Sequence, residues 1–443
     1  MPAAREAASH DVRLTHGRVL KIALPIVLSN ATVPLLGVVD TGVVGQLGQA
    51  APIGAVGLGA VILTTLYWVF GFLRMGTSGM VAQAHGAGDL AETGALLTRA
   101  LMIGGAAGAA FIVLQVPLMA GAFAVAPATA QVEGLAREYL AIRIWGAPAA
   151  IALYAVNGWL IAVERSRAVL ALQLWMNGLN VVLDLWFVLG LAWGVQGVAG
   201  ATLISEWSGL AFGLWLARPA FAGAQWRNWA RVFDRGRLKR MLAVNTDIMI
   251  RSVVLQLSFT AFTFLGARQG DVTLAANQVL LQFFQVTAYG LDGFAFSAES
   301  LVGQAVGARS VGRLRRAAWL TSQWGAAGAL LLALGFFTLG PAIIDAMTTA
   351  PEVRAAAKGY LLWVVLSPVL GIAAWMFDGI FIGATRTREM RNAMALSVAI
   401  YAASLAVLIP AFGNHGLWAG LMVLFVARGL TLWQRFPALL AAV

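Results

Sequence analysis

Residues 19–43 read VLKIALPIVLSNATVPLLGVVDTGV, and only Lys21 and Asp40 among them carry a formal charge. A bilayer core requires about 20 consecutive, mainly apolar residues for each helical span, so this stretch is long enough to cross a membrane. It also contains Pro25 and Pro34. Each proline removes a backbone donor and can kink a helix. The stretch therefore predicts a membrane-crossing helix with two candidate hinges.

Similar stretches follow along the whole chain. Hydrophobic residues make up 60% of the sequence and charged residues 11%, whereas a soluble domain is about half apolar and about a quarter charged. Lipid cannot satisfy free backbone groups, so we predict an all-α integral membrane protein with about twelve transmembrane helices. The predicted spans of the first half are 19–43, 53–80, 95–118, 135–160, 168–190 and 197–217. Those of the second half are 240–265, 272–302, 316–338, 355–382, 392–411 and 416–434.

The charge pattern is typical of membrane orientation. The net charge is +11 at pH 7, and most basic residues lie in short segments between apolar runs, above all in 218–240. Lysine and arginine concentrate on the cytoplasmic side of membranes, so we expect a multi-pass protein of a bacterial inner membrane with both termini cytoplasmic. The same pattern argues against nucleic-acid binding. The chain has no cysteine, which excludes disulfides and thiolate metal sites.

The sequence also repeats itself. Gln83-Ala84-x-Gly86-Ala87 recurs as Gln304-Ala305-x-Gly307-Ala308, and Arg165-Ser166-Arg167 recurs as Arg386-Thr387-Arg388. Ordered matches at one offset indicate duplication. We therefore predict two six-helix lobes related by a pseudo-twofold axis along the membrane normal. The predicted parts are an N-lobe of 1–220, a basic linker of 221–240 and a C-lobe of 241–443.

Acidic and amide residues inside the predicted spans are the first candidates for function, because ionisable groups at that depth are costly. Asp40 lies in the first span, where the alternative is a solvated residue at the helix end. The fifth span holds Asn177, Asn180 and Asp184, whose spacing places them on one helical face. Their alternative is a structural polar seam. Desolvation and mutual repulsion would favour protonation of one carboxyl group, so the pair could exchange a proton near neutral pH.

Other polar residues in the spans admit structural and functional interpretations alike. Arg74 and Glu299 are expected to pair across the lobes as a gate, and Asp378 is expected to be a gate or structural residue. Asp247 and Arg251 are four residues apart, so an internal ion pair is the preferred interpretation. Possible partners of the acidic site in the first lobe are Tyr139, Asn157 and Thr202.

Several of these motifs, taken in order, resemble the multidrug and toxic compound extrusion (MATE) family, and its DinF-like subgroup most of all. The resemblance covers nearly the whole chain. It rests on Leu24-Pro25-Ile26, Val39-Asp40-Thr41, Asn180-x-x-x-Asp184, Asp378-Gly379-x-x-x-Gly383-Ala384-Thr385-Arg386 and Gly413-Asn414-His415-Gly416.

The resemblance implies drug export driven by inward flow of H⁺ or Na⁺. In the DinF-like subgroup the first-span aspartate is the coupling residue, which maps to Asp40; Asn180 and Asp184 map to its fifth-span pair. Tyr139, Asn157 and Thr202 resemble the rest of that polar network. The second-lobe carboxylates of other subgroups have no clean match, because Asp40 corresponds to about Thr260 in the repeat.

We therefore expect a proton-coupled antiporter of amphipathic or cationic small molecules, working by alternating access as a monomer in the lipid bilayer. The alternatives are a Na⁺-coupled drug exporter and a lipid-linked precursor flippase. A flippase is disfavoured because the buried charge is expected to be mainly acidic and in the N-lobe. We expect no enzymatic activity, no bound metal and no cofactor besides the coupling ion, H⁺ or possibly Na⁺.

Overall fold

The computed structural model describes residues 14–46, 49–126, 128–222 and 225–443. Most of the predicted N-terminal tail lies outside the described residues. Within them, all regular structure is helical, and eight stretches are long and apolar enough to cross a membrane. The crossings α2, α10 and α13, described below, are not among these eight.

The first half of the chain supplies six crossings, two of which are interrupted. They are α2 (His16–Gly45), α3 with α4 (Ala50–Trp68 and Gly71–Gly86), α5 (Leu90–Val113), α7 with α8 (Ala130–Arg143 and Ala147–Ala162), α9 (Ser166–Asp184) and α10 (Gly194–Leu216). Shorter elements are α6 (Gln115–Val125), the 3-10 turn η1 (Ile144–Gly146) and the π-helical turn η2 (Leu185–Gly190).

The second half supplies another six crossings in fewer, longer helices. They are α12 (Arg235–Ala267), α13 (Asp271–Gly307), α14 (Val311–Met347), α15 (Pro351–Gly383) and the two arms of α16 (Thr387–Trp433). Gly413, with φ 54° and ψ −127°, breaks α16 into these arms. The short helices α11 (Trp229–Val232) and α17 (Phe436–Ala441) precede and follow this half.

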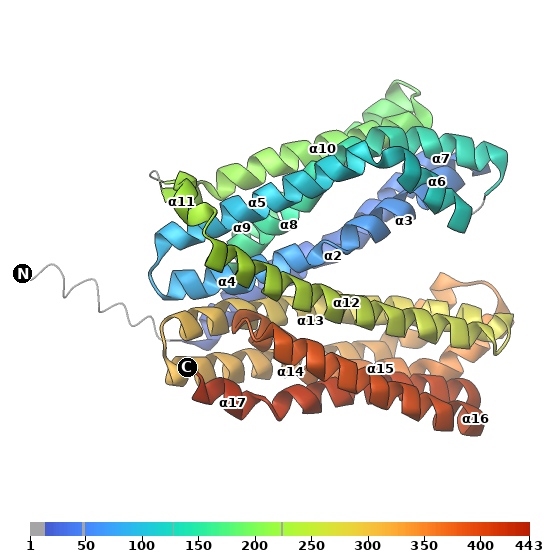
Figure 1. Ribbon diagram of the computed structural model, residues 1–443. Coiled ribbons are helices and arrows are strands. Elements are labelled where there is room, and N and C mark those ends of the chain that lie inside the picture. The colour runs from blue at the N-terminus through green and yellow to red at the C-terminus, as the bar shows by residue number, and fades with distance from the viewer. Residues whose placement is uncertain (1–13, 47–48, 127, 223–224) are drawn as a thin grey trace, which may run out of the picture.

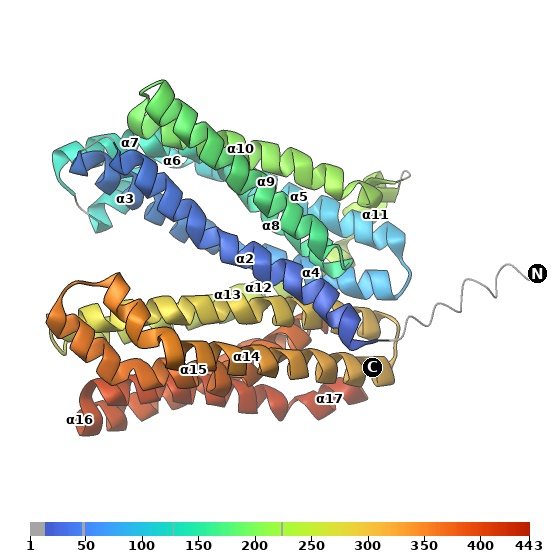
Figure 2. The same ribbon diagram turned by 180° about the vertical axis from the view of Figure 1, so that it is seen from behind.

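The helices form two bundles, which we call the N-lobe (α2 to α10) and the C-lobe (α12 to α17) (Figure 1). The lobes meet at the end of the molecule where α2 begins and α17 lies, here called the joined end. Towards the opposite end the two bundles diverge, as both views show (Figures 1 and 2). The all-α, two-lobe prediction with twelve crossings is confirmed. The predicted lobe limits stay a prediction; α12 begins within the predicted linker.

Helix α2 is part of the N-lobe but contacts both lobes. It runs diagonally from beside α13 at the joined end towards the diverging end, and α9 lies alongside it (Figure 2). Pro25 has no N–H to offer the Lys21 carbonyl, and the Ser166 hydroxyl donates to that carbonyl instead, at 2.9 Å. Gly293 of α13 fits against the backbone of α2 two residues after this proline, where a Cβ would overlap Val27. The predicted hinge at Pro25 therefore lies where α2 contacts the C-lobe.

The two copies of the duplicated motif pack against each other at the joined end. A Cβ on Gly86 of α4 would overlap the backbone carbonyl of Gln304, and a Cβ on Gly307 of α13 would overlap that of Gln83. The two copies of the motif thus pack reciprocally, each glycine admitting the carbonyl of the other copy. Glycine is required because only a residue without Cβ lets two backbones approach this closely.

The glutamine side chains repeat the same symmetry. Gln83 donates to the Gly383 carbonyl at the end of α15, and Gln304 donates to the Ala162 carbonyl at the end of α8, both at 3.0 Å. Each amide therefore caps a helix of the other lobe, where the last carbonyls lack helical partners. The pseudo-twofold relation predicted from the sequence is visible in these equivalent contacts.

We predict that Gly86→Ala opens the joined end. The added methyl group meets backbone rather than a flexible side chain, and overpacking of this kind costs roughly 1–3 kcal/mol. Because the chain has no cysteine, Ser300→Cys provides a clean reporter at a fully buried position of the interface. Maleimide labelling of Ser300→Cys in detergent should accelerate several-fold when Gly86→Ala is added.

The matched control is Gly312→Ala, because a Cβ at Gly312 has open space around it. Labelling of Ser300→Cys should keep its rate in that background. Equal labelling rates in all three backgrounds would show that the reciprocal glycine contact does not hold the joined end closed.

Candidate functional site

The N-lobe brings the predicted carboxylates together around one amide. With its nitrogen turned towards the acids, the Asn180 side chain donates to Asp40 Oδ1 at 3.0 Å and to Asp184 Oδ2 at 3.1 Å. In this orientation its oxygen accepts from the Thr202 hydroxyl at 3.1 Å. Helices α2, α9 and α10 thus contribute to a single hydrogen-bonded cluster, which we call the carboxyl pair with its Asn180 bridge.

The two carboxyl groups also contact each other directly. Asp184 is fully buried, whereas Asp40 is partly exposed. Two carboxyl groups can share a hydrogen bond only when one of them holds a proton, since ionised carboxylates only accept. The second oxygen of Asp184 is buried without a hydrogen-bond partner among the described residues. The pair is therefore built to hold at least one proton.

Asp184 lies at a local irregularity of its helix. It is the last residue of α9, and the chain continues directly into the π-helical turn η2. Single π-helical turns inside longer helices occur frequently at functional sites. Nothing in the sequence pattern signals this turn, so it was not predicted.

Of the four supporting residues, two join the helices around the carboxyl pair and two do not. Thr202 contacts the Asn180 bridge, and Asn177 donates to the Thr32 carbonyl at 3.1 Å, joining α9 to α2 two residues before Pro34. Tyr139 is buried and hydrogen-bonds the Arg143 guanidinium. Asn157, on α8, is half-buried and forms no hydrogen bond with another described residue.

A buried ion pair behind the carboxyl pair was missed. The Arg143 guanidinium donates to both Glu206 carboxylate oxygens, at 2.7 and 2.9 Å, and both residues are buried. Arg143 also attracts the Asp40 carboxylate. Sequence analysis placed Arg143 near a span end and passed over Glu206, although an acid within an apolar run such as 197–217 was a usable signal.

The predicted gate residues lie between the lobes. Arg74 of α4 and Glu299 of α13 approach within 3.4 Å, and the Arg74 guanidinium lies 3.9 Å from the Phe296 ring centroid. Asp378 of α15 accepts from Arg251 and Arg428, the latter at 2.5 Å. Their action as gates stays a prediction.

The expected ion pair between Asp247 and Arg251 is wrong. Asp247 accepts from Arg391 at 2.6 Å and from the Thr387 hydroxyl at 3.2 Å, whereas Arg251 donates to Asp378. The i, i+4 spacing makes an intrahelical pair possible, but both side chains find partners on neighbouring helices instead.

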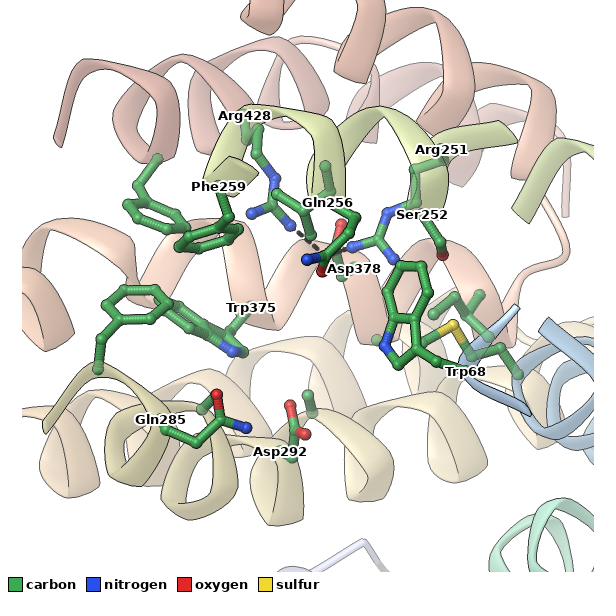
Figure 3. Close-up of a pocket in the computed structure, with 18 of the residues that line it drawn as sticks. Trp68, Arg251, Ser252, Gln256, Phe259, Gln285, Asp292, Trp375, Asp378 and Arg428 are labelled. Carbon is green, nitrogen blue, oxygen red and sulfur yellow. Dashed lines mark hydrogen bonds and ion pairs between the residues drawn. The ribbon is translucent and has the colours of Figure 1, made fainter. Parts of the chain in front are cut away.

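The C-lobe contains a charged cavity of about 480 Å³ (Figure 3). Its basic residues are Arg74, Arg251 and Arg428, and its acidic residues are Asp292, Asp378 and Glu299. The expectation that the buried charge is mainly acidic and in the N-lobe is therefore wrong. The tertiary fold gathers these charges from four C-lobe helices and α4, so no local sequence pattern reveals the cavity; Asp292 was not singled out at all.

Within the described residues, no group of three or more His, Asp or Glu side chains is placed to hold a metal ion. Both sites instead combine carboxyl groups with amide, hydroxyl or guanidinium partners. Two helical lobes that diverge at one end, each with ionisable groups inside its bundle, are typical of a membrane transporter.

The MatE family model matches residues 25–186 and 248–408. The chain therefore belongs to the MatE family of multidrug efflux transporters. It is 40% identical to the DNA damage-inducible protein F of Escherichia coli, over 96% of this chain and 93% of the relative. It is 27% identical to the probable multidrug resistance protein NorM of Pseudomonas aeruginosa, over 94% of this chain and 88% of the relative.

A crystal structure of the Vibrio cholerae MATE transporter VcmN in the bent form has the same fold. Its TM-score is 0.86 at 20% identity, covering 96% of this chain and 97% of that chain. The predicted membership of the MATE family and its DinF-like subgroup is confirmed. The homologues are transporters rather than enzymes.

We predict that Glu206→Gln strongly destabilises the protein. Removing one partner of a buried ion pair leaves an uncompensated charge and costs roughly 3–5 kcal/mol. Thermal unfolding of the detergent-solubilised protein should show a large drop in Tm. The double variant Arg143→Met with Glu206→Leu should recover much of the loss, because no lone charge remains.

Glu133→Gln is the matched control, because Glu133 lies on α7, the helix that carries Arg143. The Arg137–Glu133 pair is exposed, with side chains 48% and 30% accessible, and such pairs contribute about 0–1 kcal/mol. If Glu206→Gln and Glu133→Gln lowered Tm equally, the Arg143–Glu206 pair would not be a structural anchor of the N-lobe.

Proposed function

We propose that this transporter exports amphipathic small molecules in exchange for H⁺, and that Asp40, Asp184 and Asn180 form its proton site. The observation that carries this proposal is the Asn180 bridge between a buried and a partly exposed carboxyl group. The amide holds both acids within one hydrogen-bonded cluster, so the protonation of one acid changes the bonds available to the other.

Proton exchange follows from this geometry. Asp184 is shielded from solvent, whereas Asp40 has partial access and is the group that meets protons from the diverging end. When Asp40 gains a proton it becomes a donor as well as an acceptor. The Asn180 nitrogen then loses an ionised acceptor on α2, and the contacts between α2 and α9 rearrange.

The rearrangement reaches the C-lobe through α2. This helix contacts α13 near the joined end and α9 along its length, at Lys21, Thr32 and Asp40, and it contains both Pro25 and Pro34. A bend at either proline would change the surroundings of the carboxyl pair and the packing of α2 on Gly293 together. In the proposed cycle, protonation bends α2, the position of the lobes shifts and substrate leaves. Return of the lobes then releases the proton on the other side of the membrane.

The coupling needs a difference in affinity between two states. A proton and a substrate exchange for one another when each stabilises a different conformation of the same element. Helix α2 is that element in our proposal, because it carries Asp40 and also contacts the C-lobe.

We further propose that the joined end faces the cytoplasm of a bacterial inner membrane. Helix α11 and the beginnings of α12 and α16 lie at this end, and they contain or adjoin Arg231, Arg235, Arg237, Lys239, Arg240, Arg386 and Arg388. Positive residues favour the cytoplasmic side. The carboxyl pair and the C-lobe cavity are each assembled within one chain, which supports function as a monomer.

The test is uptake of a fluorescent lipophilic cation into inside-out vesicles under imposed pH or Na⁺ gradients. We expect the wild type to accumulate the probe under a pH gradient. Asp40→Asn should reduce this uptake at least about tenfold, because a permanently neutral amide has no proton to exchange. Asp345→Asn should transport normally, since Asp345 is exposed and paired with Lys358 at the surface.

Each outcome discriminates between functions. Normal pH-driven uptake by Asp40→Asn would overturn the proton site. Uptake driven by Na⁺ alone would retain the exporter and replace the coupling ion. Absence of uptake of every tested cation would favour a lipid or metabolite substrate.

A further inference from the structure

The C-lobe cavity has an excess of positive charge on one wall. Arg251 of α12 and Arg428 of α16 both donate to the same oxygen, Asp378 Oδ2. One carboxylate neutralises one guanidinium group, so this wall keeps an uncompensated positive charge. Both arginines are 5% exposed, and charge at such burial is costly unless it is paired.

The same wall also has more donors than acceptors. Each guanidinium group offers five N–H donors, and Asp378 accepts one hydrogen bond from each arginine. The Nε atoms of Arg251 and Arg428 are buried and have no hydrogen-bond partner among the described residues. Both side chains line the cavity, so a ligand with an anionic oxygen would accept from their other N–H groups and supply the missing negative charge.

The opposite wall has an acidic side chain without a partner. Asp292 of α13 faces the Arg251–Asp378–Arg428 group across the cavity, next to Gln285 (Figure 3). Its carboxyl group forms no hydrogen bond or ion pair with a described residue. Arg74 and Glu299, the remaining charged residues of the cavity, pair with each other. Asp292 is therefore free to meet a cationic group of a ligand.

Aromatic rings line the space between these walls. Phe284, Trp375 and Phe425 stack together, with ring centroids 5.2 Å apart for Phe284 and Phe425 and 5.3 Å apart for Trp375 and Phe425. Phe259 packs against Phe284 and extends the group. Flat apolar surfaces of this kind favour an aromatic ligand. The cavity volume of about 480 Å³ lies within the range of small-molecule sites.

We propose that the C-lobe cavity binds aromatic zwitterions, with the anionic group at Arg251 and Arg428 and the cationic group at Asp292. This inference rests on the proposed export function and specifies its substrate class. A simple cation satisfies Asp292 but leaves the arginine wall without an acceptor. A simple anion satisfies that wall but leaves Asp292 unpaired. Only a molecule with both charges completes the two walls.

The experiment compares two probes that share one ring system. Tetramethylrhodamine carries a delocalised cation and a carboxylate, whereas its methyl ester carries the cation alone. Binding of each to the purified full-length protein in detergent is measured by fluorescence anisotropy, without any ion gradient. The wild type should bind the zwitterion at least about tenfold more tightly than the ester, because hydrogen bonds to charged groups are the stronger kind.

Two variants separate the walls. Arg428→Gln leaves Arg251 paired with Asp378, so this wall becomes neutral and no lone buried charge disturbs folding. The preference of this variant for the zwitterion over the ester should fall to about twofold or less. Asp292→Asn should weaken both probes by similar factors and preserve their ratio, because both carry the cation. Asp345→Asn, at the exposed surface, should change neither affinity.

The outcomes are decisive in either direction. Equal or tighter binding of the ester by the wild type overturns the proposal, as does an unchanged preference in Arg428→Gln or failure of both probes to bind. Failure of the proton site would appear instead in the vesicle uptake of Asp40→Asn, with the binding preference intact. The two proposals can therefore fail separately.

Discussion

Two backbone carbonyl groups, each seated against a glycine of the other lobe, hold this transporter together at one end. The Gln304 carbonyl occupies the space that a side chain at Gly86 would need, and the Gln83 carbonyl does the same at Gly307. Because the contact is reciprocal, it fixes the pseudo-twofold relation between the lobes. Because it is confined to the joined end, the helices beyond it are free to diverge.

The parts of this architecture that depend on chain periodicity could be predicted. Apolar stretches of bilayer length predicted the crossings, and the recurring Gln-Ala-x-Gly-Ala motif predicted the duplication. Helical spacing placed Asn180 and Asp184 on one face of α9. The prediction that they contact Asp40 rested on the family resemblance and on depth in the membrane, because no spacing within one helix relates α2 to α9.

Partners on different helices were beyond the reach of such patterns. Arg251 was assigned to Asp247 because the two share a helix face, yet long arginine side chains reach carboxylates on neighbouring helices. The fold instead pairs Arg251 with Asp378 and Asp247 with Arg391. Glu206 and Arg143 are likewise 63 residues apart in sequence. In an apolar environment a charge takes whichever counter-charge the tertiary packing brings closest, and that choice is made by helix arrangement rather than by spacing.

The two lobes thus contain sites of different chemistry that share structural elements. The N-lobe holds carboxyl groups bridged by an amide, an arrangement suited to protons. The C-lobe holds opposed charges and aromatic rings, an arrangement suited to a larger molecule. Arg74 extends from α4 of the N-lobe into the C-lobe cavity and pairs there with Glu299, and α2 carries Asp40 while packing on α13. A change in lobe position therefore alters both sites at once. Exchange of a proton for a substrate needs no direct contact between them, only that each site favours a different position of the same two lobes.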